Sequence, residues 1–132
     1  MMTRLRRTAL AAALLCAVSV AFGADFDGSK RLICATVDAD ACDPGEACLR
    51  GLPDDVGAPR FMRIDLAEKV IAGPKRTTAI RYMDTGADQI LMQGTELGYA
   101  WTVVLDKTDG SMSMTFVNRE DTFVVFGYCT PP

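Results

Sequence analysis

The sequence contains no histidine among its 132 residues. A Ser-His-Asp triad and a Cys-His pair are therefore excluded, and the side chain that most often transfers protons near neutral pH is missing. The sequence also has no P-loop, no G-x-G-x-x-G fingerprint and no G-x-S-x-G motif. An enzyme would have to use carboxylates, tyrosine or lysine, and a pair of carboxylates could hydrolyse glycosides. We therefore expect a protein that is not an enzyme, and a carboxylate-based hydrolase is the weaker alternative.

Metal and redox chemistry are disfavoured in the same way. Without histidine and without a C-x-x-C pair, neither a zinc site nor a redox-active dithiol is indicated. The densest acidic cluster is Asp38, Asp40, Asp43 and Glu46. It does not fit the EF-hand pattern, because Asp43 stands where the calcium loop needs glycine. We interpret this cluster as a solvated loop and expect no metal and no cofactor.

The first 23 residues have the three parts of a secretory signal peptide. Arg4, Arg6 and Arg7 form the positive start, an apolar run covers residues 8–22, and small residues precede Ala24. The apolar run is too short for a comfortable membrane span. We expect cleavage near Ala24, a single β domain over residues 24–132, no membrane span after removal of the leader, and a location in the periplasm or outside the cell.

Five cysteines are present, and Cys16 lies within the predicted leader. The remaining four form an even set, which in an exported chain indicates two disulfides. Four cysteines allow three pairings. We favour Cys42 with Cys48, which would staple a short loop, and Cys34 with Cys129, which would join the first predicted strand to the last.

The net charge of the chain limits which classes of binding partner are expected. The whole chain has a net charge of −3, and the leader charges are all basic, so the rest is more acidic still. Nucleic acid and anionic lipid are therefore poor partners. The main basic residues after the leader are Arg60, Arg63, Lys75, Arg76 and Arg81. They could gather into a patch that faces an anion, but we interpret them as ordinary surface charge.

From residue 60 onward the apolar residues alternate with polar ones, which is typical of strands that are buried on one face. Asp- and Gly-containing turns separate the runs. The predicted strands cover residues 31–37, 62–66, 78–83, 89–93, 99–105, 112–116 and 123–129. The last run is apolar on both faces, so we expect it to be central in the sheet or covered. The sequence predicts an all-β fold, a small antiparallel meander or barrel of seven or eight strands, with a two-layer sandwich as the alternative.

One short helix is expected in the disulfide-braced loop. The segment Asp43-Pro44-Gly45-Glu46 resembles a helix start, with Asp as N-cap, Pro at the first helical position and Glu at the third. Gly51 and Pro53 would end this helix after about two turns.

Two predicted strand faces are candidates for binding. Tyr99 and Trp101 share one face, and Met112 and Met114 share another. Both faces would line the inside of a barrel, where such residues either fill the core or surround a ligand. From these faces and the missing catalytic groups, we predict a non-enzymatic binding module. Its partner would be a small apolar ligand or an envelope protein.

A set of short segments spans nearly all of the predicted mature chain: Leu32-Ile33-Cys34-Ala35, Cys42 with Cys48, Pro59-Arg60-Phe61, Ile64-Asp65, Leu91-Met92-Gln93-Gly94, Gly98-Tyr99-Ala100-Trp101 and Phe126-Gly127-Tyr128-Cys129-Thr130. In combination they resemble a group of small exported proteobacterial proteins with four cysteines. The resemblance implies a periplasmic location and paired cysteines, and it carries no known activity.

The expected architecture also resembles the periplasmic inhibitors of C-type lysozyme, which are small barrels with a loop similar to Ser-Gly-Ser-Gly. This chain has Asp109-Gly110-Ser111 instead, so the inhibitory loop is not carried over. An inhibitor of that type, or a structural accessory of the envelope, is the alternative to ligand binding.

Overall fold

The computed structural model describes residues 24–132. The predicted signal peptide, with Cys16, lies outside this part of the chain. The described elements, in chain order, are η1 (Ala24–Phe26), β1 (Leu32–Cys42), β2 (Leu49–Gly51), η2 (Pro53–Val56), β3 (Phe61–Asp65), β4 (Val70–Ala72), β5 (Thr77–Ala79), β6 (Tyr82–Thr85), β7 (Gln89–Glu96), β8 (Tyr99–Asp106), β9 (Ser111–Val117) and β10 (Thr122–Thr130). Over residues 24–132, no helix has the length and apolar character that a membrane crossing requires.

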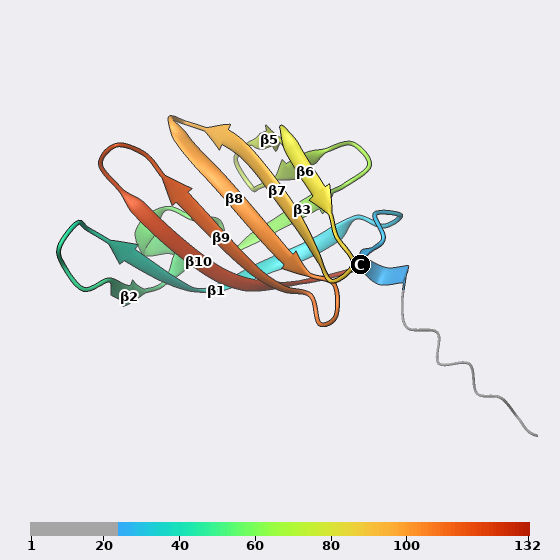
Figure 1. The fold of residues 1–132 in the computed structure, drawn as a ribbon, viewed down its shortest axis with the longest axis horizontal. Coiled ribbons are helices and arrows are strands. Elements are labelled where there is room, and N and C mark those ends of the chain that lie inside the picture. The colour runs from blue at the N-terminus through green and yellow to red at the C-terminus, as the bar shows by residue number, and fades with distance from the viewer. Residues whose placement is uncertain (1–23) are drawn as a thin grey trace, which may run out of the picture.

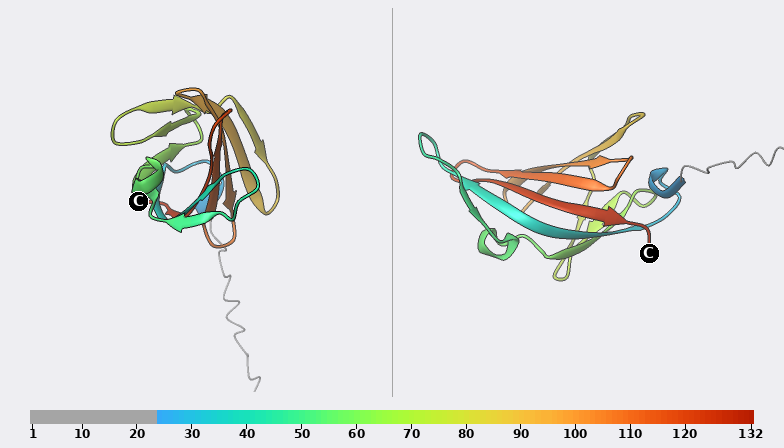
Figure 2. Two further views of the ribbon diagram at one scale, coloured as in Figure 1. Left: turned by 90° about the vertical axis from the view of Figure 1, so that its left-hand side faces the viewer. Right: turned by 90° about the horizontal axis from the view of Figure 1, so that it is seen from below.

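All ten strands belong to one antiparallel sheet. Nine follow the order β5-β4-β3-β1-β10-β9-β8-β7-β6, and β2 pairs separately with the second half of β1. Figure 1 shows the broad sheet from β1 to β8, and Figure 2 shows how it curls around one concave face. The predicted all-β fold is confirmed, and the sheet forms a curled half-barrel rather than a two-layer sandwich.

The concave face carries the hydrophobic core, because alternate residues of each strand point inward. The largest fully buried side chains include Leu32, Ile64, Ile90, Met92 and Leu105, which come from four strands, β1, β3, β7 and β8. β10 is the middle strand of the nine, as its apolar sequence predicted. Its inner face is buried, whereas its outer face is open to solvent.

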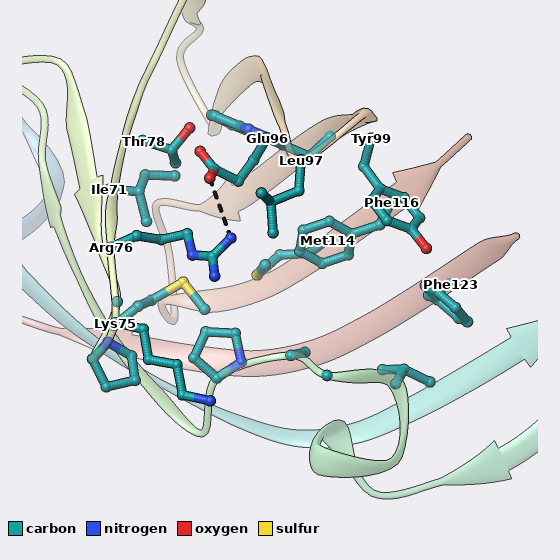
Figure 3. A pocket seen from close by; sticks show the side chains of 18 of the residues that line it. Ile71, Lys75, Arg76, Thr78, Glu96, Leu97, Tyr99, Met114, Phe116 and Phe123 are labelled. Carbon is teal, nitrogen blue, oxygen red and sulfur yellow. Dashed lines mark ion pairs between the residues drawn. The ribbon is translucent and has the colours of Figure 1, made fainter. Parts of the chain in front are cut away.

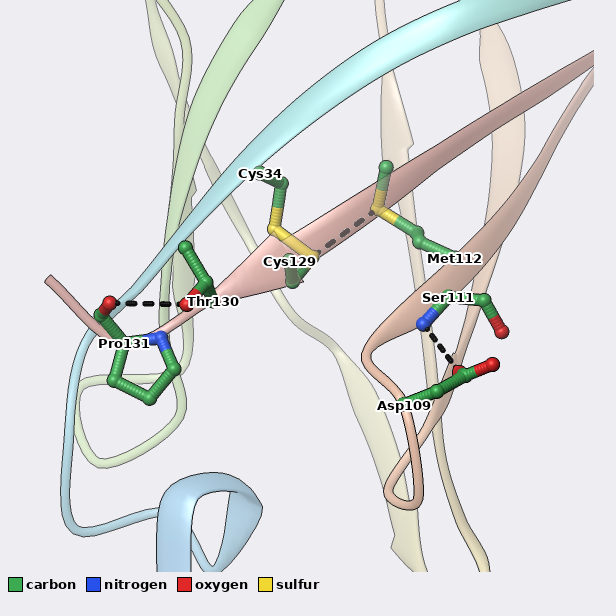
Figure 4. The surroundings of a disulfide bond; sticks show 7 residues. All are labelled: Cys34, Asp109, Ser111, Met112, Cys129, Thr130 and Pro131. Atoms are coloured by element: carbon green, nitrogen blue, oxygen red, sulfur yellow. Dashed lines mark hydrogen bonds between the residues drawn. A yellow bond between two sulfur atoms is a disulfide. The ribbon is translucent and has the colours of Figure 1, made fainter.

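Both predicted disulfides are confirmed. Cys34 of β1 is bonded to Cys129 of β10, 95 residues later, and the two are direct neighbours in the strand ladder. The Sγ of Cys129 lies 3.7 Å from the Sδ of Met112 (Figure 4). Because Cys129 has no thiol hydrogen, this is a van der Waals contact. The second bridge, Cys42–Cys48, closes the loop between β1 and β2.

The prediction of a short helix after Cys42 is wrong. Residues 43–48 form the loop of a hairpin, because β2 pairs antiparallel with residues 39–41 of β1. Gly45 has a φ of 81°, a left-handed conformation that an α-helix does not contain. The single helical turn of this region comes later, at η2, where a carboxylate oxygen of Asp55 accepts a hydrogen bond from the Leu52 N–H at 2.8 Å.

The sheet has more strands than the seven or eight predicted. The short strands β2 and β4 were missed, and the strand predicted over residues 78–83 is two strands, β5 and β6. The break falls at Ile80 and Arg81, whose backbone N–H groups donate to the carbonyl oxygens of Lys69 and Gln93, both at 2.8 Å. The segment therefore leaves β4 and joins β7, which brings the two edges of the half-barrel together.

The segment from η2 to β3 runs beside β1 and forms a second wall of the concave side, opposite β8 and β9. The pairing of β1 with β10 shifts register between Thr36 and Asp38. At this point the buried Thr36 donates its N–H to the Arg60 carbonyl oxygen at 2.9 Å and its hydroxyl to the Pro59 carbonyl oxygen at 2.8 Å. The segment from η2 to β3 is thereby fixed in place.

Candidate functional site

A cavity of about 670 Å³ lies on the concave side of the sheet, and Figure 3 shows part of its lining. One wall is the inner face of β8, β9 and β10. The other is the segment from η2 to β5, and the turn between β7 and β8 completes the rim. The lining is mostly apolar and includes Met62, Ile71, Leu97, Tyr99, Trp101, Val103, Met114, Phe116 and Phe123. Its volume is in the range of about 300–1,000 Å³ that is typical of ligand sites.

Trp101 lies against the backbone of β7. A Cβ at Gly94 would collide with its indole ring and would lie 2.8 Å from the carbonyl oxygen of Ala79. Glycine at this position therefore lets the indole pack close to the sheet. Trp101 is 4% exposed, and its buried Nε1 has no hydrogen-bond partner within residues 24–132. A buried unpaired donor costs about 1–3 kcal/mol, so this group is a candidate for an additional polar partner.

Tyr99 is fixed at the mouth of the cavity. Its hydroxyl donates a 2.9 Å hydrogen bond to Asp121, in the loop between β9 and β10. This bond to the carboxylate raises the pKa of Tyr99, because it favours the protonated phenol. The Tyr99 ring also lies 6.0 Å from that of Phe123, centroid to centroid. Tyr99 therefore joins β8 to the start of β10.

Three cations line the cavity, although the sequence interpretation treated them as ordinary surface charge. Arg60 pairs with Asp54 at 2.6 Å, and Arg76 pairs with Glu96 at 3.6 Å. Within residues 24–132, Lys75 forms no ion pair. All three come from the wall opposite β8 and β9.

The other two residues of the basic group lie elsewhere. Arg63 lines a smaller depression with Ile33 and Phe61, on the convex side of β1 and β3. Arg81 is exposed beside β7. The five basic residues therefore do not form one patch.

Leu97 was missed by the sequence analysis. It occupies the turn between β7 and β8 with a φ of 50° and is 73% exposed, yet it lines the cavity. A large apolar residue in a left-handed position is uncommon and strained, and such strain gathers at functional sites. The sequence feature that could have identified it is a leucine directly before Gly98, at a position where a hairpin turn normally carries polar residues.

Three of the four predicted binding residues line the cavity, and one does not. Tyr99, Trp101 and Met114 contribute to its wall. Met112, two residues before Met114 on the same face of β9, is 2% exposed and packs beside the Cys34–Cys129 disulfide. The methionine stripe therefore runs from the core into the cavity.

The predicted solvated acidic loop is only partly correct, because Asp38 and Asp40 lie on β1, whereas Asp43 and Glu46 lie in the loop that follows it. Asp38 forms an ion pair with Arg50 of β2 at 2.6 Å. This contact raises the pKa of Arg50, because the neighbouring carboxylate favours the charged guanidinium. In residues 24–132, no three Asp, Glu, His or Cys side chains gather in a way that would hold a metal ion.

No protein-family model matches this chain, and no significant match was found among curated proteins or solved structures.

Proposed function

We propose that the protein is a non-enzymatic binding module that holds a small, mostly apolar ligand in the concave cavity. The single observation that carries this proposal is the cavity of about 670 Å³ with aromatic and methionine side chains on one wall. Apolar walls around a space of this size are what a binding site needs.

The carboxylates of the cavity support binding over catalysis. Asp54 and Glu96 are the two acidic side chains in the lining, and each faces an arginine of the same site. A glycosidase needs one carboxyl group that donates a proton and a second that acts as base or nucleophile. Two carboxylates that are each engaged by an arginine do not suit the proton-donating role.

We propose further that the protein works in the periplasm or outside the cell. The signal-peptide pattern of residues 1–23 supports this location. The two disulfides are consistent with an oxidising compartment.

A decanol titration tests the proposal. We expect decanol to quench or shift the emission of Trp101, the single tryptophan, and to raise the melting temperature. At a free ligand concentration of about 100 times Kd, the gain in stability is about 2.7 kcal/mol. An unchanged melting temperature together with unchanged emission would contradict ligand binding.

Two neighbouring valines of β8 provide a matched pair of variants. Val103 faces the cavity and Val104 faces the convex side, so Val103→Phe fills the site and Val104→Phe does not. We expect decanol affinity to fall about tenfold or more in Val103→Phe and to stay within twofold in Val104→Phe. Ile71→Phe fills the cavity from the opposite wall, so it repeats the test if Val103→Phe does not fold.

A protein-facing role, as inhibitor or envelope accessory, is the second candidate. It is favoured by exposed aromatic residues on the convex face. Phe61 and Tyr128 lie on either side of Ala35 in the strand ladder and are 65% and 59% exposed. If this alternative is correct, Val103→Phe and Ile71→Phe leave binding of the partner protein intact, whereas Tyr128→Ser removes it.

A further inference from the structure

The side-chain polar groups of the cavity are unequally satisfied. Each carboxylate of the lining has a cationic neighbour: Asp54 pairs with Arg60 at 2.6 Å and Glu96 with Arg76 at 3.6 Å. The Tyr99 hydroxyl is already engaged with Asp121. Among the cations of the lining, Lys75 and Arg76 retain unused hydrogen-bond donors.

Arg76 is placed to use this capacity inside the cavity. Figure 3 shows its guanidinium directed among apolar side chains, near Leu97 and Met114. The 3.6 Å separation from Glu96 is longer than an N–H···O hydrogen bond, so the ion pair leaves the guanidinium donors unused. A guanidinium carries five N–H donors and binds planar oxyanions through two of them at once.

The cations of the lining all lie on one wall, whereas the wall formed by β8, β9 and β10 is apolar. Trp101, Met114 and Phe116 are on strands β8 and β9, whereas Lys75 and Arg76 are on the loop between β4 and β5. A ligand that touches both regions needs an apolar body and an anionic end.

We infer that the ligand of this cavity is an amphipathic anion, whose oxyanion head lies between Arg76 and Lys75 and whose apolar chain covers Met114 and Trp101. The inference rests on the proposed function and adds the chemical class of the ligand. The whole chain has a net charge of −3, yet the lining carries three cations against two carboxylates. The local excess of positive charge attracts anions to a protein that otherwise repels them.

Three probes with the same alkyl chain test the inference: decanoate, decanol and decyltrimethylammonium, each titrated below its micellar concentration and followed by Trp101 emission. We expect decanoate to bind about tenfold or more tightly than decanol, because a charge-assisted hydrogen bond is worth about 1.5–3 kcal/mol. Decyltrimethylammonium is expected to bind more weakly than either. Equal affinities of decanoate and decanol would overturn the inference and leave the proposed function standing.

Charge variants assign the effect to the site. Arg76→Met is expected to remove the preference for decanoate over decanol, and Lys75→Met to reduce this preference. Arg81→Met removes an equal charge outside the lining and is expected to preserve the preference. A preference that survives Arg76→Met and Lys75→Met together would contradict the head-group assignment. Failure of all three probes to bind the wild-type protein would overturn the proposed function as well.

Discussion

Removal of the Cys34–Cys129 disulfide is expected to lower the free energy of unfolding by about 4 kcal/mol. The bridge closes a loop with a sequence separation of 95, and the chain-entropy model gives the largest stabilisation to the longest loops. It also joins β1 to β10, the central strands of the sheet. In the Cys34→Ala/Cys129→Ala variant, we expect the melting temperature to fall by about 15–20 °C. Thermal unfolding followed by circular dichroism measures this change.

The second disulfide provides the control. Cys42–Cys48 has a sequence separation of 6 and lies in an exposed hairpin loop, so the Cys42→Ala/Cys48→Ala variant should lose about half as much stability. Strong reductant should lower the melting temperature of the wild-type protein at least as far as the Cys34→Ala/Cys129→Ala substitution does. Equal losses in the two double variants would show that loop length is not the cause, and no loss in either would contradict a structural role for the bridges.

The second large effect is expected at Gly127 of β10. A Cβ at this position would collide with the carbonyl oxygen of Ala35 and would lie 3.0 Å from the Cα of Thr36. These are backbone atoms of β1, at the point where its register shifts, so they cannot move aside as a side chain can. We expect Gly127→Ala to cost about 3 kcal/mol, the upper end of typical overpacking effects. Urea unfolding followed by Trp101 emission gives the difference.

Gly73→Ala is the matched control for this substitution. A Cβ at Gly73 would meet its nearest atom, the Arg76 carbonyl oxygen, at 3.6 Å, which is ordinary contact. Its stability is expected to remain within about 0.5 kcal/mol of the wild type. If Gly127→Ala unfolds at the same urea concentration as Gly73→Ala, β1 and β10 do not approach each other as closely as described.

The sequence was sufficient to predict the elements whose local pattern agrees with their final environment. The alternation of Met112, Met114 and Phe116 with polar residues places these side chains on the inner face of β9, as observed. The pairing of Cys34 with Cys129 followed from their places on the first and last predicted strands, and the ladder brings them together.

The sequence misled where tertiary pairing overrides local preference. Asp43 and Pro44 favour a helix start, but the pairing of β2 with β1 and the Cys42–Cys48 bridge impose a hairpin. Similarly, the alternation over residues 78–83 indicates one strand, and nothing local shows that the chain changes partner at Ile80.

Only one wall of the candidate site could be predicted from the sequence, because the other wall is placed by tertiary pairing. Tyr99 and Trp101 were identified because an apolar strand face has a recognisable period. Lys75 and Arg76 precede β5 and meet these residues only through the curl of the sheet, which the sequence alone does not specify.

Methionine methyl NMR with decanoate tests most directly the central claim, that the concave cavity is the binding site. Met62 and Met114 line the cavity, whereas Met92 and Met112 are fully buried and are not part of the lining. We predict that saturating decanoate shifts the methyl resonances of Met62 and Met114 strongly and those of Met92 and Met112 little. Unchanged resonances of Met62 and Met114 at a decanoate concentration that saturates the Trp101 signal would contradict the account.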